Sequence, residues 1–272
     1  MTLESIRLGI IGGGVMGEAI LSRLLDKNIY PANAVLLSEP QLQRRIFLEQ
    51  QYQIQTTADN QAAASASEVL LLAVKPQALD TVITNLTGDK PSSHQPLVIS
   101  IVAGVTLEKL EEAFPQQPII RAMPNTPATV GAGMTAIAPG TKTGSQHLLK
   151  AKSIFEAVGR VVEVPESLMD AVTGLSGSGP AYVAIAIEAL ADGGVAAGLP
   201  RAVAYQLALQ TVLGTAQLLE RSQLHPAELK DRVTSPGGTT IAGVAELERN
   251  GFRSALIQAV QAAYHRSQEL GK

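Results

Sequence analysis

The stretch RLGIIGGGVMG, residues 7–17, decides the fold. Its apolar start, Arg7–Ile11, predicts a β-strand, and a helical pattern runs from the end of the stretch through Lys27. Between them the glycines follow the spacing G-x-G-x-x-G, which lets the backbone approach a pyrophosphate group at the helix N-terminus. An ordinary structural turn is the alternative. The residues of the predicted dinucleotide site are Gly12, Gly13, Gly14, Val15, Met16 and Gly17.

On the C-terminal side of this stretch, short apolar runs alternate with helical patterns. The run Glu68–Val74, EVLLLAV, is continuous rather than alternating, as is typical of a parallel strand covered on both faces. Alternation of strands and helices indicates a doubly wound parallel sheet. We therefore predict an α/β fold with a Rossmann-type dinucleotide-binding domain over residues 1–165. The other strand candidates are Ala34–Ser38, Gln53–Thr56, Leu97–Val102, Ile119–Met123, Met134–Ala138 and Val161–Val164.

After about Pro165 the pattern becomes helical. Proline favours the first turn of a helix, and helices are expected to open at Pro180, Pro200 and Pro226. Gly251 separates the last two helical segments. We therefore predict a C-terminal all-α domain over residues 166–272.

Two of these segments, Ala181–Ala197 and Ala202–Leu219, are apolar nearly all round. A small helical domain cannot bury two such helices alone, and exposed apolar faces normally mark an association surface. We expect a homo-oligomer with a dimer as its smallest unit. Although Ala202–Leu219 carries no formal charge, its glutamines and the flanking Pro200 and Glu220 favour a buried helix over a membrane span.

Composition excludes several classes of protein. Hydrophobic residues make up 46% of the chain and charged residues 17%, which argues against disorder. The net charge of −3, without a long run of one sign, argues against a surface for nucleic acid or anionic membranes. The chain has no cysteine and no recognisable secretion signal, so we expect a cytoplasmic protein. The histidines lack metal-ligand spacing, and no metal site is expected at His94, His147, His225 or His265.

The sequence leaves two alternatives for the ribose 2′ group of the dinucleotide. An acidic residue about 20 positions after the glycine turn is expected to bind the 2′-hydroxyl of NAD. Here the chain reads Ser38-Glu39-Pro40, followed one helical turn later by Arg44 and Arg45. Glu39 suits NAD, whereas Ser38 with an arginine suits the 2′-phosphate of NADP. The arginines equally suit a solvated helix face.

A second glycine-rich turn, VTSPGGTTI, covers Val233–Ile241. Pro236-Gly237-Gly238 must form a tight turn, and the next residues through Glu248 predict a helix. Free N–H groups at that helix start, flanked by hydroxyls, favour a pocket for a small carboxylate. An ordinary capped helix start is the alternative.

With this turn the chain resembles the pyrroline-5-carboxylate reductase family. The family's C-terminal signature is matched by P-x-x-L-x-x-x-V-T-S-x-G-G-x-T over Pro226–Thr240. The blocks LLLAVKPQ over Leu70–Gln77, RAMPNTP over Arg121–Pro127 and VTGLSGSGPAY over Val172–Tyr182 also look like family blocks. The resemblance covers essentially the whole chain, with the motifs in the family's order.

The resemblance implies hydride transfer from NADPH, with NADH also accepted, to the C=N bond of 1-pyrroline-5-carboxylate. The product is L-proline, in the last step of proline biosynthesis. Residues 166–272 are then a substrate and dimerisation domain. Besides the glycine turn, the implied cofactor-binding residues are Ser38, Asn60, Ala73, Val74, Lys75 and Pro76. The implied substrate-binding residues are Ser235, Gly238, Thr239 and Thr240.

For the chemistry, we expect the substrate carboxylate on the N–H groups of Gly238, Thr239 and Thr240. We hypothesise that the Thr240 hydroxyl hydrogen-bonds the ring nitrogen and that water or Lys75 completes the proton path. Alternatively, Lys75 only positions the cofactor or caps a strand end. For the whole chain, the alternatives are another two-domain NAD(P)-dependent imine or hydroxy-acid dehydrogenase, and a non-catalytic dinucleotide-responsive binding protein.

Overall fold

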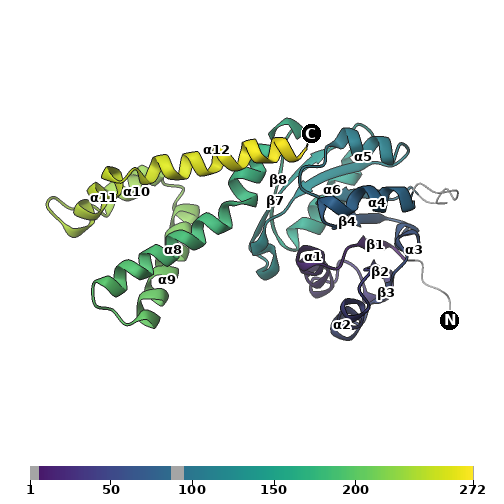
Figure 1. Cartoon of the computed structure of the whole chain (residues 1–272), viewed down its shortest axis with the longest axis horizontal. Helices are drawn as coiled ribbons and strands as arrows, with labels where there is room; N and C mark the ends of the chain where they lie inside the picture. The colour runs from purple at the N-terminus through teal and green to yellow at the C-terminus, as the bar shows by residue number, and fades with distance from the viewer. Residues whose placement is uncertain (1–5, 87–94, 272) are drawn as a thin grey trace. The chain divides into compact units, whose positions relative to one another are not determined.

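The computed structural model describes residues 6–86 and 95–271 (Figure 1). His94, one of the four histidines considered above, lies outside the described residues. The chain forms two compact units: Met1–Gly177 together with Ala263–Lys272, and Ser178–Ala262. This grouping by compactness does not test function, so the division at 165/166 into a dinucleotide domain and a substrate and dimerisation domain stays a prediction.

The described part of the first unit is built on an eight-stranded sheet with the order β3-β2-β1-β4-β5-β6-β7-β8. Strands β1 to β6 run parallel, whereas β7 is antiparallel to β6 and β8 is parallel to β7. The predicted doubly wound Rossmann-type α/β fold is confirmed, with the reversal at β7 as an addition. The strands are β1 (Leu8–Ile11), β2 (Val35–Ser38), β3 (Gln55–Thr57), β4 (Val69–Leu72), β5 (Leu97–Ser100), β6 (Ile119–Met123), β7 (Gly133–Pro139) and β8 (Gly159–Glu163).

Helices cover both faces of this sheet, as Figure 1 shows for α1 on one side and α4 and α5 on the other. The α-helices of the unit are α1 (Val15–Asp26), α2 (Leu42–Tyr52), α3 (Asn60–Ala64), α4 (Pro76–Leu86), α5 (Leu107–Ala113), α6 (Ser145–Glu156) and α7 (Met169–Val172). Short 3₁₀ and π turns complete it: η1 (Ala32–Ala34), η2 (Thr126–Val130), η3 (Glu166–Leu168) and η4 (Thr173–Gly177).

The core explains why the strands read as continuous apolar runs. In β4, Leu71 packs in the cluster that includes side chains of α1, α2 and α6, while Leu70 and Leu72 pack in the cluster on the opposite face. All three side chains are buried, so neither face of the strand has room for a polar residue.

The described part of the second unit is helical, as predicted. Its elements are α8 (Gly179–Ala196), α9 (Arg201–Ser222), α10 (Pro226–Arg232), α11 (Thr239–Arg249) and the first part of α12 (Phe252–Leu270). The expected helix openings at prolines are confirmed for α8, α9 and α10, where a proline is the N-cap or lies in the first turn. Gly251 separates α11 from α12 and has a φ of 70°.

Helices α8 and α9 pack through small side chains, with Ala191, Ala204 and Ala208 buried between them. The same helices also expose large apolar side chains, for example Ile185 at 64% and Leu207 at 54%. Among the described residues, no helix is both long enough and apolar enough to cross a bilayer.

The last residues of α12 belong to the first unit, a feature that the sequence analysis missed. The Ser267 hydroxyl is buried and donates to Oδ1 of Asp170 at 2.7 Å. Asp170 in turn lies 4.0 Å from the guanidinium of buried Arg121, which donates to Glu166 at 3.0 Å. Polar contacts therefore join Ser267 of α12 to Asp170 of α7 and, through it, to Arg121 of β6.

Candidate functional site

The candidate cofactor site lies where the strand order of the sheet reverses. Strands β2 and β4 flank β1, and the register aligns Ile11 with both Ser38 and Leu72. The glycine turn, Glu39 and Ala73 therefore leave the sheet at the same edge, the carboxyl ends of parallel strands. In open α/β sheets a crevice at this point is where ligands bind.

Two glycines of the turn are required by the packing of the protein itself. Gly12 has a φ of 106°, and a Cβ atom there would lie 2.5 Å from the carbonyl oxygen of Ala73. A Cβ atom at Gly17 would lie 2.2 Å from the carbonyl oxygen of Gly12. These residues bring β1, the first turn of α1 and the end of β4 into close contact, which is what the predicted turn requires.

Gly14 is different, because a Cβ atom there would meet nothing within 4 Å. It is the N-cap of α1 and makes no side-chain cap hydrogen bond. The N–H groups of Gly14, Val15 and Met16 have no acceptor in residues 6–86 and 95–271. Open space in front of free N–H groups at the positive end of a helix dipole fits the pyrophosphate of a dinucleotide.

The structure brings together Ser38 and Asn60, two of the cofactor-binding residues that the resemblance implies. Ser38, the last residue of β2, is buried and donates its hydroxyl to Oδ1 of Asn60 at 2.7 Å. Asn60 opens α3 and is half-buried. The neighbouring carboxylate of Glu39 turns to the backbone of the glycine turn, where it accepts from the N–H of Gly13 at 3.0 Å.

The segment Ala73–Pro76 follows β4 beside the turn. The N–H of Ala73 donates to the carbonyl of Ile11 at 2.8 Å, and Pro76 opens α4. Lys75 is exposed, and its ammonium group has no partner within the described residues. It therefore does not cap a strand end in this structure, and the alternatives of proton path and cofactor positioning stay open.

The candidate substrate turn lies in the second unit, in front of α11. Gly237 has a φ of 69°, and a Cβ atom at Gly238 would lie 2.4 Å from Oγ of Ser235. The N–H of Gly238 donates to the carbonyl of Ser235 at 3.0 Å. This N–H is therefore engaged by the turn and is not free for a carboxylate, because the tight turn closes on its own backbone.

The next two residues are available. Thr239 and Thr240 are exposed, and their N–H groups donate to no acceptor in the described chain. The hydroxyls of Ser235, Thr239 and Thr240 also make no hydrogen bond within the described chain. By contrast, the hydroxyl of Thr234 turns back to the carbonyls at the end of α10, at 3.1 and 3.0 Å. The start of α11 thus presents donors to a ligand, in a different unit from Lys75.

Sequence reasoning gave no role to Asn125, although it quoted the segment that contains it. Its amide donates to the carbonyl of Ser176 at 3.0 Å and accepts from the N–H of Met134 at 2.8 Å. One side chain therefore ties the end of β6 to β7 and to η4, a π turn of the type often found near functional sites. Only the fold brings these segments together, so the sequence carries no signal for the contact.

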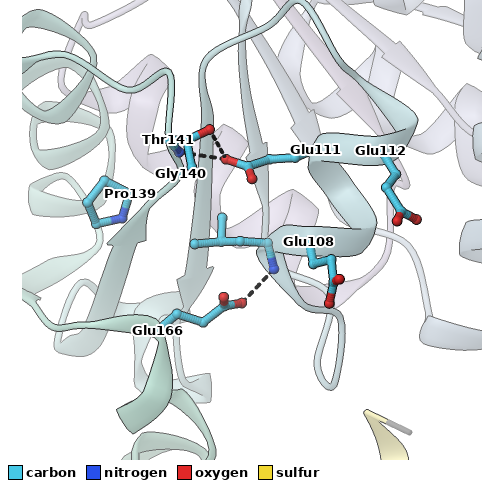
Figure 2. A pocket seen from close by; sticks show the side chains of 8 residues that line it. Glu108, Glu111, Glu112, Pro139, Gly140, Thr141 and Glu166 are labelled. Atoms are coloured by element: carbon cyan, nitrogen blue, oxygen red, sulfur yellow. Dashed lines mark hydrogen bonds between the residues drawn. The ribbon is translucent and has the colours of Figure 1, made fainter.

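A separate pocket of about 480 Å³ lies beside α5 (Figure 2). Two of its carboxylates are already used by the protein. Glu111 accepts from the N–H and the hydroxyl of Thr141 at 2.6 and 2.8 Å. Glu166 accepts from the N–H of Leu107 at 2.5 Å and from Arg121. The pocket contains none of the predicted site residues, and we assign it no chemistry. The expectation that the chain holds no metal stays a prediction.

Comparisons with known proteins bear on both units. A family model described as pyrroline-5-carboxylate reductase dimerisation matches residues 166–270, and one described as NADP oxidoreductase, coenzyme F420-dependent, matches residues 7–104. A pyrroline-5-carboxylate reductase of Synechocystis sp. is 65% identical over 268 residues, which cover 98% of this chain and 99% of that relative.

Solved structures agree over the full length. A pyrroline-5-carboxylate reductase from Coxiella burnetii has a TM-score of 0.90 and 36% identity, with 99% of this chain and 100% of that chain covered. A Plasmodium falciparum pyrroline carboxylate reductase, solved with NADP bound, has a TM-score of 0.88 and 33% identity, with the same coverage.

Proposed function

The chain belongs to the pyrroline-5-carboxylate reductase family, and from this premise we propose that it reduces 1-pyrroline-5-carboxylate to L-proline with NADPH, accepting NADH as well. This is the reaction that ends proline biosynthesis. The observation that carries the proposal is the start of α11, where free N–H groups and hydroxyls follow a tight turn in which Gly237 has a positive φ. An anionic substrate with an adjacent ring nitrogen matches these donors.

The dinucleotide is held by the first unit. The N–H groups of Gly14, Val15 and Met16 face open space and bind the pyrophosphate, while Gly12 and Gly17 keep the turn close to β4. As the resemblance implies, the ribose lies near Ser38, Asn60 contacts the cofactor, and Ala73–Pro76 line the nicotinamide side; Ser38 and Asn60 are hydrogen-bonded to each other. When bound, the cofactor supplies the hydride that the C=N carbon accepts.

The substrate carboxylate binds at the start of α11. The N–H groups of Thr239 and Thr240 and the hydroxyl of Ser235 donate to it, and Gly238 contributes by leaving the space of a side chain. Fixing the carboxylate fixes which face of the ring is presented for reduction, and this supplies the proximity contribution to catalysis.

Reduction adds a hydride to the ring carbon and a proton to the ring nitrogen, so a donor near that nitrogen is needed. We assign this role to the hydroxyl of Thr240, which is exposed and makes no hydrogen bond within the described residues. A hydroxyl that the protein does not use is free to bond to the imine nitrogen, and water or Lys75 delivers the proton.

The homo-oligomer forms through the C-terminal helices, as a dimer or a larger assembly. Support comes from the exposed apolar side chains of α8 and α9, which are too many for an isolated surface. They are Val183, Ile185, Leu190, Val203, Leu207, Leu209, Leu213 and Leu218. We place the protein in the cytoplasm, with no nucleic-acid or membrane partner, since the chain lacks cysteine and a basic surface.

The proposed function is tested by following the absorbance of NADPH in the presence of 1-pyrroline-5-carboxylate and then of a panel of 2-keto acids. Oxidation with the imine alone, and proline as the product, supports the proposal. Oxidation with keto acids alone indicates a hydroxy-acid dehydrogenase. Binding of NADPH without turnover of any substrate indicates a non-catalytic dinucleotide-binding protein.

A further inference from the structure

The carboxylate of Glu39 is committed to the backbone. Its Oε2 accepts from the N–H of Gly13 at 3.0 Å, and its Oε1 accepts from the N–H of Gln41 at 3.0 Å. The side chain is only 8% exposed. An acidic side chain with both oxygens bonded to main-chain donors and little access to solvent is poorly placed to bind a ribose hydroxyl as well.

The other polar group of Gly13 is held from α2. Nε of Arg44 donates to the Gly13 carbonyl at 2.7 Å, while its Nη2 pairs with Glu18 in the first turn of α1. The guanidinium also lies over the ring of Phe47, 5.0 Å from its centre. Arg44 is therefore fixed on three sides, and its charge is already paired.

The partner of Arg44 is itself anchored. The hydroxyl of Tyr52 donates to Oε1 of Glu18 at 2.7 Å. Burial, reinforced by this hydrogen bond, raises the pKa of Tyr52 to about 12, so the phenol stays protonated and keeps donating. An apolar surface completes the arrangement, because a Cβ atom at Gly13 would lie 2.7 Å from Cδ1 of Leu48.

We infer that Glu39 and Arg44 are positioning residues that clamp Gly13 from both sides, and that neither reads the 2′ group of the dinucleotide. The inference rests on the proposed function, since it concerns the same cofactor site. The sequence rule that matches an acid after the second strand with NAD does not apply here, because this acid serves the turn. The clamp therefore contributes equally to the binding of NADPH and NADH, and residues other than Glu39 and Arg44 determine the preference between the two cofactors.

Calorimetric titration of the full-length protein with NADPH and with NADH tests this inference. In Glu39→Gln, the amide oxygen still accepts one N–H, whereas Glu39→Leu removes both acceptors. We expect the Kd of both nucleotides to rise by about tenfold in Glu39→Leu and by less in Glu39→Gln. The ratio of the two Kd values stays within about twofold of wild type, because the loss is common to both ligands.

Matched variants give the controls. Glu49→Gln removes one acidic charge from α2, where the Glu49 carboxylate accepts from the Thr56 hydroxyl, and we expect unchanged Kd values. Arg44→Lys keeps the positive charge, but an ammonium group cannot donate to Gly13 and Glu18 at the same time with the planar geometry of a guanidinium. This variant still tests the inference if the Glu39 variants do not fold. In all of these variants we expect the KM for 1-pyrroline-5-carboxylate to stay within about twofold of the wild-type value. General unfolding would instead impair substrate binding as well.

Three outcomes overturn the inference. Tighter NADPH binding with weaker NADH binding in Glu39→Gln identifies Glu39 as a ribose ligand. A selective loss of NADPH in Arg44→Lys identifies Arg44 as a phosphate ligand. Unchanged Kd values in every folded variant remove the clamp. A wild-type protein that binds neither nucleotide instead refutes the proposed function, and the clamp with it.

Discussion

The N-cap residues of α1 and α11 have almost the same backbone conformation, but different kinds of contact hold the two helix starts in place. Each follows a glycine-rich turn, and the N-caps Gly14 and Gly238 have φ, ψ values of −69°, −176° and −79°, 173°. Around α1, residues from β2, α2 and β4 enclose the turn. Around α11, Gly237 has no neighbour within 4 Å of a Cβ position, and the three atoms nearest to a Cβ at Gly238 all belong to Ser235.

The difference shows what each start depends on. The turn before α1 is fixed by long-range contacts, so its free N–H groups are preorganised for a large ligand. The turn before α11 is fixed by local sequence alone, by a positive φ and one hydrogen bond between neighbours. Changes to the first should therefore alter the stability of the protein together with cofactor binding, whereas changes to the second should act on the substrate.

The largest effect is expected for Gly12→Ala. A methyl group at a φ of 106° and 2.5 Å from the Ala73 carbonyl forces the turn away from β4. We expect the free energy of unfolding to fall by about 2–4 kcal/mol and NADPH binding to be lost. Denaturant unfolding and NADPH titration measure the two effects.

Gly14→Ala is the matched variant for that experiment. Its methyl group meets nothing within 4 Å, and its φ of −69° suits any residue. We expect wild-type stability with NADPH binding that is weaker by about tenfold or more, because the methyl group occupies the space in front of the free N–H groups. Equal destabilisation by the two variants would contradict the distinction between them.

The next largest effect is expected on kcat, from substitution of Thr240 at the start of α11. Thr240→Ala should lower kcat by about ten- to a hundredfold with little change in stability, since a donor to the ring nitrogen is lost. Thr240→Ser should retain most of the activity. Thr234→Ser is the control, because the Thr234 hydroxyl bonds within its own turn. Undiminished turnover of Thr240→Ala at saturating substrate removes Thr240 from the mechanism.

A smaller effect is expected for Gly237→Ala, which compares directly with Gly12→Ala. Both glycines have a positive φ, but Gly237 has open space around it. The cost should be backbone strain alone, about 1 kcal/mol, with a severalfold rise in the KM for 1-pyrroline-5-carboxylate. A destabilisation as large as that of Gly12→Ala would show that α11 is also held by long-range contacts.

The smallest effect, on the pH dependence of stability, is expected for a change at Glu68, near the amino ends of β1 and β4. Its carboxylate accepts hydrogen bonds from Arg7 at 2.5 Å, from Lys150 at 2.9 Å and from Tyr30 at 3.3 Å. Burial acts to raise the pKa of Glu68, but the hydrogen bonds from Arg7 and Lys150 outweigh it and lower the pKa overall. This carboxylate therefore stabilises the folded state above its unfolded pKa of about 4.3 and loses that contribution as the pH falls further.

Glu68→Gln should accordingly show a weaker loss of stability on acidification than wild type. Thermal unfolding across acidic pH values measures this, with Glu49→Gln as a control for the removal of an acidic group. A parallel pH dependence of wild type and Glu68→Gln would exclude Glu68 as the source.

Much of the fold could be predicted from the sequence because its signals are local. The apolar run Glu68–Val74 and the prolines at 180, 200 and 226 mark strands and helix starts through neighbouring residues alone. The direction of β7 could not be predicted, since a short apolar strand reads the same in either orientation. The return of Ala263–Lys272 to the first unit depends on Ser267 meeting Asp170, 97 residues away.

The candidate site likewise contains features that local sequence patterns predict and features that depend on contacts between distant segments. The positions of the glycine turns follow from their spacing, whereas the hydrogen bond between Ser38 and Asn60 is seen only in the structure. The direction of the Glu39 carboxylate, in contrast, depends on where β2 ends relative to β1, and no local pattern encodes it. The N–H of Gly238 was expected to be free, but the tight turn engages it with Ser235.

The return of the last residues to the first unit also affects how the protein is made. A ribosome releases the chain from its N-terminus, yet the Asp170 partner, Ser267, is synthesised 97 residues later. The first unit therefore cannot reach its final form until the helices of the second unit, which precede Ser267 in the chain, have been synthesised. Completion of this unit requires Ser267, so a product truncated before this residue would lack the hydrogen bond to Asp170.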